Sequence, residues 1–182
     1  QPYVTRTYLA PERNPGDQSV PAALTLLAEI LGGGQTSVLT QKLQLEAQNA
    51  VYTTAFYSGT AFDKTSFGFV IMPSERVSLR EVEAALDQAL VEFLKEGPDP
   101  DKLKRLKRQY RAAEIYARDS VQRLANSYGV ALTSGLSLDD IHEWPDILQA
   151  VTTDDIMAAA KLVLKEQTSV TGWLMKPEEA KE

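Results

Sequence analysis

The residues of this chain that could do chemistry are few, and their spacing completes no catalytic set. Gly32, Gly33 and Gly34 precede Thr36 and Ser37, which gives the segment the glycine content of a phosphate-binding loop. The glycines follow a predicted helix instead of a strand, however, and the lysine that a nucleotide loop places on the outer phosphates is missing. We therefore interpret them as a left-handed end of one helix, with Thr36 or Ser37 capping the next.

The single histidine, His142, begins a stretch that imitates half of a zinc-protease helix. The position of a second histidine ligand is Asp146, and Pro145 disturbs the helical spacing that two ligands need. With no cysteine and one histidine, the chain excludes disulfides, thiolate zinc sites and a histidine-pair metal site. No Gly-x-Ser-x-Gly sequence occurs, and a Ser-His-acid triad has little room to form. We expect no catalytic residue and no metal ligand in this chain.

Composition indicates one folded domain. The 182 residues are 43% hydrophobic and 24% charged, which is enough to build a core. Nineteen basic against 25 acidic residues give a net charge of -6, so we expect no nucleic-acid partner. No apolar run reaches the roughly 20 residues of a membrane span. The start at Gln1 is neither a methionine nor a basic signal-peptide region, and we expect a mature or excised piece of a longer protein.

The elements that must position any site follow from the spacing of apolar residues. Alternation predicts a strand at 3–10, and a further strand is expected at 169–175. Segments 51–58 and 67–72 are rich in aromatic and β-branched residues, which predicts two strands joined in an antiparallel hairpin. Helical spacing predicts a first helix that Ser19 caps and the three glycines end. Further helices are expected at about 36–48, between Ser78 and Gly97, from Pro100 onward, and at about 138–150 and 154–165.

Two of these helices carry further detail. Ser78 and Glu81 form a capping box before a helix with one apolar face. The stripe that begins after Pro100 stays in phase to Ala131. As one rod this helix would be about 50 Å long, which exceeds the roughly 40 Å diameter of a compact chain of this size. We therefore expect a break near 119–120.

Strands at the chain ends and in a hairpin, with helices clustered between them, predict an α+β fold. One antiparallel sheet with helices packed on one face satisfies every stripe. We see no internal repeat and no domain boundary, so residues 1–182 are expected to form a single domain.

Two surface features could bind a partner. Tyr52 and Tyr57 are separated by an odd number of residues, so they lie on opposite faces of their strand and one of them faces away from the core. A local run of basic residues could dock an acidic partner surface or an anionic substrate segment, although we favour a solvated helix face as its explanation: Lys102, Lys104, Arg105, Lys107, Arg108 and Arg111.

In order and spacing the chain resembles the second half of the pitrilysin, insulinase and mitochondrial processing peptidase family of zinc peptidases. The resemblance covers about residues 4–175. It is carried by the helix ending in 28–34, by 36–39, by the strand with Ala50, Val51 and Tyr52, by the capped helix, and by 116–120.

In that family two homologous α+β domains occur in tandem, and only the first carries the His-x-x-Glu-His zinc motif. The resemblance therefore implies that this chain is the non-catalytic second half of a larger subunit, which closes a peptide-binding chamber and mediates subunit contacts. Zinc would be bound by the absent N-terminal catalytic domain. The implied partners are a peptide or protein substrate, that N-terminal domain, and a homologous subunit or a second copy in a homodimer. Family members of the two-subunit type are often exported, so a periplasmic location is expected, with the cytoplasm as the alternative.

The family often supplies an arginine and a tyrosine from this domain, with six residues between them, to contact the peptide or the oxyanion. Tyr52 falls at the position of the family's tyrosine. Gln44 is one residue farther from Tyr52 than the family's arginine would be, and it is uncharged. Tyr52 and Gln44 are thus the implied substrate-binding residues. The departure at Gln44 fits family members in which an inactive homologue supplies the arginine and tyrosine in trans.

Two other functions stay open. One is a catalytically inactive structural or peptide-binding subunit of the same family, which an upstream sequence without His-x-x-Glu-His would indicate. The other is an unrelated freestanding α+β binding module, which would bind its partner without any upstream domain.

Overall fold

The computed structural model describes residues 1–117 and 119–176. It confirms the predicted α+β class, with an antiparallel sheet and helices on one face. The elements in chain order are β1 (Tyr3–Ala10), α1 (Ser19–Gly32), η1 (Thr40–Glu46), β2 (Ala50–Tyr57), β3 (Thr65–Pro73), α2 (Leu79–Glu96), α3 (Pro100–Ala117), α4 (Val121–Thr133), α5 (Leu138–Ala150), α6 (Thr153–Val163), η2 (Glu166–Thr168) and β4 (Ser169–Leu174).

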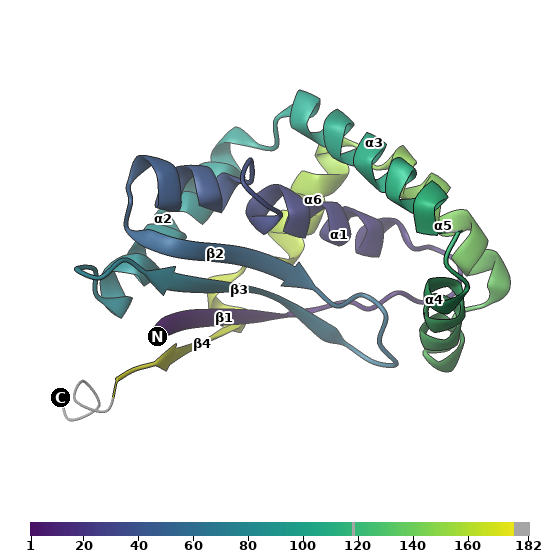
Figure 1. The fold of residues 1–182 in the computed structure, drawn as a ribbon, viewed down its shortest axis with the longest axis horizontal. Coiled ribbons are helices and arrows are strands. Elements are labelled where there is room, and N and C mark those ends of the chain that lie inside the picture. The colour runs from purple at the N-terminus through teal and green to yellow at the C-terminus, as the bar shows by residue number, and fades with distance from the viewer. Residues whose placement is uncertain (118, 177–182) are drawn as a thin grey trace.

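The sheet has the strand order β2-β3-β1-β4, and each neighbouring pair is antiparallel. The first and last strands of the chain lie side by side (Figure 1), with Arg6 opposite Thr171. The predicted hairpin joins β2 to β3, and its register is irregular between Ala50 and Tyr52. β2 and β4 are therefore the edge strands.

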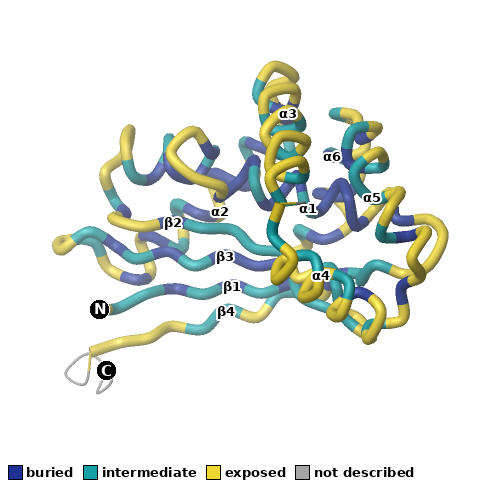
Figure 2. The backbone as a smooth tube through the Cα atoms, turned by 45° about the vertical axis from the view of Figure 1, so that its right-hand side comes forward, coloured by how far each residue is buried: buried dark blue, intermediate teal, exposed yellow. Residues whose placement is uncertain are grey.

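The buried side chains of the strands point toward one helical layer. Alternate residues of β1 and β3 are buried, among them Tyr8, Phe67 and Phe69. They pack with α1, α2 and α6, while α3 and α5 lie farther from the sheet (Figures 1 and 2). α1 is apolar on most of its surface and is buried between β2, α6, α5 and α3, as expected for a helix without a polar face.

The glycines after α1 act as a helix end, as interpreted from the sequence. Gly34 has a φ of +86°, in the left-handed region that favours glycine. Gly32 lies against β2 so closely that a Cβ atom there would stand 1.9 Å from the backbone nitrogen of Ala55. The first glycine therefore sets how near α1 comes to the sheet.

Capping explains most of the helix starts. The capping box of Ser78 and Glu81 is confirmed, and two more occur where paired aspartates begin α5 and α6. The start of α1 differs from the prediction, because Gln18 and not Ser19 is the cap residue and makes no capping hydrogen bond. The Gln18 side chain is buried and is used in tertiary contacts instead.

The predicted helix at 36–48 was wrong in its geometry. The chain forms two helical residues and then the π-helix η1, with the amide of Ala47 bonded to the carbonyl oxygen of Lys42. Leu39 and Leu43 are buried as expected, but Ala47 is exposed. The wider turn of a π-helix changes which residues share a face, because it inserts extra residues into the helical repeat.

The break in the long helical stripe is confirmed, since α3 ends at Ala117 and α4 begins at Val121 with Ser120 as its cap. The expectation that the whole stripe is inward was wrong. Val121 is 81% exposed, and Ala131 is the buried residue of α4. After the break, α4 turns away from the main helical layer and lies near α5 (Figure 1).

Candidate functional site

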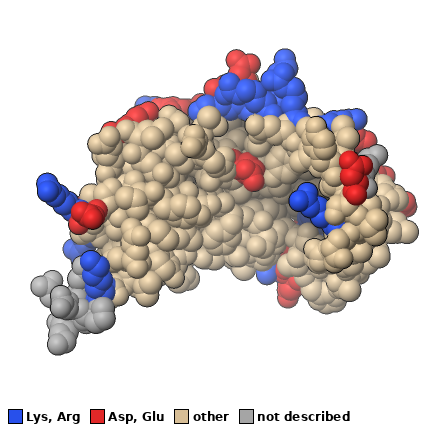
Figure 3. Space-filling view, in the orientation of Figure 1, with Lys and Arg blue, Asp and Glu red and all other residues tan. Residues whose placement is uncertain are grey.

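The face of the sheet opposite the helices, here called the open face, carries no charged side chain. Of the four strands, only β1 contains a charged residue, Arg6, and that side chain points to the helical layer. In the view of Figure 3 the surface over the strands is largely uncharged, and charged side chains lie mainly at its margins. By strand register the open face comprises Tyr3, Thr5, Thr7, Leu9, Tyr52, Thr54, Phe56, Ser66, Gly68, Val70, Met72, Val170, Gly172 and Leu174.

Tyr52 lies on this open face near the start of β2. Its side chain is 45% exposed, and its strand partner is Met72. Tyr57 has the opposite orientation, as the odd spacing predicted. It packs on Phe67, and its hydroxyl donates to the carbonyl oxygen of Pro11 at 2.5 Å. Burial raises the pKa of Tyr57, so this hydroxyl stays protonated as a donor.

Gln44 lies on the other side of β2 from Tyr52, in a network of buried hydroxyl groups. Its Nε2 atom donates to Oγ1 of Thr53 at 2.7 Å. The hydroxyls of Thr53 and Thr40 are 3.2 Å apart, and that of Ser37 is 3.0 Å from that of Thr40. The network fastens η1 to β2. The structure therefore places the two predicted site residues on opposite sides of β2, Tyr52 in the strand and Gln44 in η1, and does not bring their side chains together.

Arg6 is a buried cation that the sequence analysis did not single out. Its side chain bonds to Glu83 at 2.7 Å, to Asp87, and through Nε to Thr171 at 2.9 Å. Burial alone would lower the pKa of Arg6, but the hydrogen bonds to Asp87 and Glu83 raise it above its usual value. The indole of Trp173 donates to Glu83 as well, at 2.9 Å. These contacts hold α2 and β4 to β1, so the buried charge of Arg6 has a structural role in the fold.

The basic run on α3 is partly used within the fold. Nζ of Lys107 donates to the carbonyl oxygen of Gln149 at 2.7 Å, and Arg111 lies 3.4 Å from Asp146. Lys104, Arg105 and Arg108 are exposed. This fits a solvated helix face with two contacts to α5.

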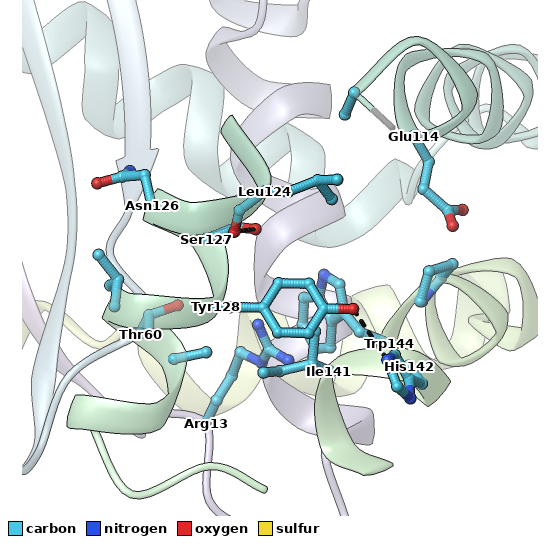
Figure 4. Close-up of a pocket in the computed structure, with 14 residues that line it drawn as sticks. Arg13, Thr60, Glu114, Leu124, Asn126, Ser127, Tyr128, Ile141, His142 and Trp144 are labelled. Carbon is cyan, nitrogen blue, oxygen red and sulfur yellow. Dashed lines mark hydrogen bonds between the residues drawn. The ribbon is translucent and has the colours of Figure 1, made fainter. Parts of the chain in front are cut away.

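A cavity of about 880 Å³ lies between the loop after β1, α4 and α5 (Figure 4). The guanidinium of Arg13 lies 3.6 Å over the ring of Trp144, and its Nε donates to Gln18 at 2.8 Å. The hydroxyl of Tyr128 is 2.9 Å from Nε2 of His142. The sequence analysis weighed His142 alone. Arg13, the basic residue that follows the first strand, could have indicated this cavity and was not singled out.

Within residues 1–117 and 119–176, no three histidine, aspartate or glutamate side chains are grouped so that they could hold an ion. Over the same residues, no helix is both long enough and apolar enough to cross a membrane.

Comparison with protein families gives a match over residues 1–110 to the peptidase M16 inactive domain. The chain belongs to this family. No curated protein sequence matches it. The α+β fold, with its sheet flanked on one side by helices, is thus the fold of an inactive peptidase domain.

Three solved structures show the same fold. A protease from Helicobacter pylori has a TM-score of 0.85 at 18% identity, and the match covers 96% of this chain and 41% of that one. The inactive peptidase domain of a candidate zinc protease from Bordetella parapertussis has a TM-score of 0.84 at 17% identity, with 97% and 91% covered. The periplasmic protease PqqL from Escherichia coli has a TM-score of 0.71 at 19% identity, with 96% and 19% covered. This chain thus spans less than half of the Helicobacter protease but nearly all of the Bordetella domain.

Proposed function

We propose that this chain is the non-catalytic C-terminal domain of a zinc-dependent metalloendopeptidase, in which it closes one side of a peptide-binding chamber and contacts the partner subunit. The observation that carries the proposal is the uncharged open face, in a chain that belongs to the inactive-domain family. A wall of apolar and hydroxyl side chains can lie against peptides of many sequences, because it neither attracts nor repels charged residues.

The function of such a wall is closure. A zinc ion held by the N-terminal domain would supply an activated water for attack on the peptide carbonyl. Closing the chamber excludes bulk water, which strengthens every electrostatic contact with the reacting group. In this chain the helical layer keeps the sheet rigid, so the open face can act as a fixed surface.

Within the wall, Tyr52 is the proposed donor to the bound peptide. Its phenol is exposed on the open face and its strand is fixed from behind by the network of Gln44, Thr40 and Thr53. Gln44 uses its Nε2 atom in that network, whereas no described residue hydrogen-bonds to its Oε1 atom. Gln44 lies on the other side of β2 from Tyr52, so we propose that it contacts a peptide that reaches past this edge strand, where its oxygen can accept an N–H in place of the family's donating arginine.

The partners follow from the same proposal. They are a peptide or protein substrate, the N-terminal catalytic domain, and a homologous subunit or a second copy. Export from the cytoplasm is proposed as well, supported by the fold shared with a periplasmic protease. A catalytically inactive subunit of the same family is the alternative, and the presence of His-x-x-Glu-His upstream of Gln1 decides between the two.

The test uses the full-length protein and the variant Tyr52→Phe. Loss of one hydroxyl donor to developing charge should lower kcat/KM on a fluorogenic peptide by about tenfold or more, while the unfolding midpoint stays unchanged because Tyr52 is half-exposed. The control is Tyr116→Phe, since Tyr116 is exposed on α3 away from the open face. Metal analysis of the same samples should find zinc in the full-length protein and none in this chain alone. Unchanged peptidase activity in Tyr52→Phe would remove Tyr52 from the site, and stoichiometric zinc on this chain would contradict the assignment as a whole.

A further inference from the structure

We infer that the cavity at Arg13 is a binding site for an organic carboxylate, borne by a ligand with an aromatic or aliphatic body. The inference rests on the side chains around this cavity and does not depend on the proposed function. It concerns a different part of the molecule, because Tyr52 lies near the start of β2 whereas Thr60, on the cavity wall, follows the end of that strand.

Arg13 is a partly buried cation that lacks a carboxylate partner among the residues that the structure describes. The contrast with Arg6, which holds two carboxylates, is direct. The nearest acidic group, Asp140, is already engaged: its Oδ1 atom accepts from the amide of Gly16 at 2.9 Å, and its Oδ2 atom accepts from the amide and hydroxyl of Ser137 at 2.8 and 2.5 Å. Burial lowers the pKa of Arg13 to about 10, and the charge of Asp140 offsets this only in part.

The guanidinium of Arg13 is held flat with part of its edge unused. Its face lies on Trp144 at 3.6 Å, and Nε donates to Gln18. Nη2 is 3.5 Å from the carbonyl oxygen of Asp140, and Nη1 has no acceptor among the described residues. A planar guanidinium with free in-plane donors matches a carboxylate, which accepts two parallel hydrogen bonds.

The rest of the cavity defines the body of the ligand. Apolar side chains line much of it, including Leu124, Ile141 and Pro145, and its volume falls in the range of small-molecule sites. The ring pair of Tyr128 and His142 adds polar atoms to the same lining (Figure 4).

The charge of the described lining matches that of a carboxylate. Arg13 is the one arginine or lysine among the described residues of the wall, and a single guanidinium pairs with one carboxylate. The carboxylate can come from the free C-terminus of a peptide or from an Asp or Glu side chain.

The test is an NMR titration of this 182-residue chain, whose fold matches a related domain that was solved by itself. The chain has two tryptophans, and they report on different places. The indole of Trp144 lines the cavity, whereas that of Trp173 is bonded to Glu83. N-acetylphenylalanine at millimolar concentration should shift the Trp144 signal and leave the Trp173 signal in place.

The charge-matched probe decides whether the carboxylate is what binds. N-acetylphenylalanine amide keeps the ring and lacks the charge, and it should bind at least about tenfold more weakly. Arg13→Gln should reduce the acid to the affinity of the amide, while Arg105→Gln, at an exposed position on α3, should change nothing. Three peptides distinguish a side-chain carboxylate from a C-terminal one. Two have blocked termini and contain Phe-Glu or Phe-Gln, and the third ends in a phenylalanine with a free carboxylate.

Equal affinity for the acid and the amide in the unmodified chain would overturn the inference, and so would the absence of any Trp144 shift. This comparison needs no variant, so it stands even if Arg13→Gln fails to fold. Because the readout is binding and not proteolysis, a negative result leaves the proposed chamber function untouched.

Discussion

Gly32 is the position where one added methyl group should cost this protein most. It is the last residue of α1, where the helix crosses β2. A Cβ atom at Gly32 would lie 1.9 Å from the nitrogen of Ala55 and 2.6 Å from the carbonyl carbon of Thr54. Both obstacles are backbone atoms of a paired strand, so they cannot rotate away as a side chain would. Gly32→Ala therefore forces the helix and the strand apart.

The magnitude follows from that displacement. Ordinary contact needs about 3.5 Å, so α1 would have to withdraw by roughly 1.5 Å. Leu24, Leu27 and Leu31 of the same helix are fully buried, and each would lose contacts. Overpacking of this kind costs about 1 to 3 kcal/mol, and the upper end applies where backbone is the obstacle. The better helix propensity of alanine returns less than about 1 kcal/mol at a helix end. We expect a net loss of at least about 2 kcal/mol.

The assay is chemical and thermal unfolding of the chain followed by circular dichroism. A loss of 2 kcal/mol should lower the midpoint by about 4 to 8 °C in a chain of this length. The control is Gly129→Ala in α4, because nothing lies within 4 Å of a Cβ atom there. It should keep or raise the midpoint. If both alanine variants melt like the unmodified chain, the close approach of α1 to β2 does not exist in solution, and the reasoning is refuted.

Two further predictions concern buried charge. Arg6→Met should lower the free energy of unfolding by about 2 to 4 kcal/mol, because it leaves two carboxylates without their cation. Asp87→Asn should cost less than about 1 kcal/mol, because that side chain is half-exposed. Equal losses of the two variants in urea titrations would contradict this. The pKa of Asp140 is lowered, first by the hydrogen bond from the Ser137 hydroxyl and then by backbone amides, so its contribution is present above about pH 3.9 and lost as the pH falls through the lowered value. Asp140→Asn should thus cost about 1 kcal/mol near pH 7 and progressively less as the pH falls through the lowered pKa, and a cost that does not change with pH would show that the charge is not responsible.

The local elements of this fold could be predicted from the sequence because their signals are short-range. Ser78 and Glu81 lie three residues apart, and their capping box requires nothing beyond the helix that they begin. The break after Ala117 follows from the length of a helix against the size of the domain. The opposite orientation of Tyr52 and Tyr57 follows from the pleat of a strand.

The errors occurred where distant residues compete with a local preference. Gln18 takes the cap position of α1 because its side chain is bonded to Arg13 and to Asp140, far along the chain. The π-helix η1 carries Gln44 to Thr53 of the next strand, and no helical periodicity reveals such a contact. The apolar stripe of α4 is only partly buried, with Val121 exposed and Leu124 and Tyr128 half-buried, because the break turns it out of the layer to which α3 belongs.

By itself, the sequence determined the fold class, most of the strands and helices, the absence of cysteine and of a second histidine, and the place of Tyr52 on a strand face. These depend on residue types and on spacings within one element. Only the tertiary structure decided that the four strands leave one face of the sheet without charged side chains, that Arg6 but not Arg13 is paired with carboxylates among the described residues, and that a cavity forms beside Trp144. Each of these depends on which side chains from separate elements reach the same point, and that is fixed by packing and not by spacing along the chain.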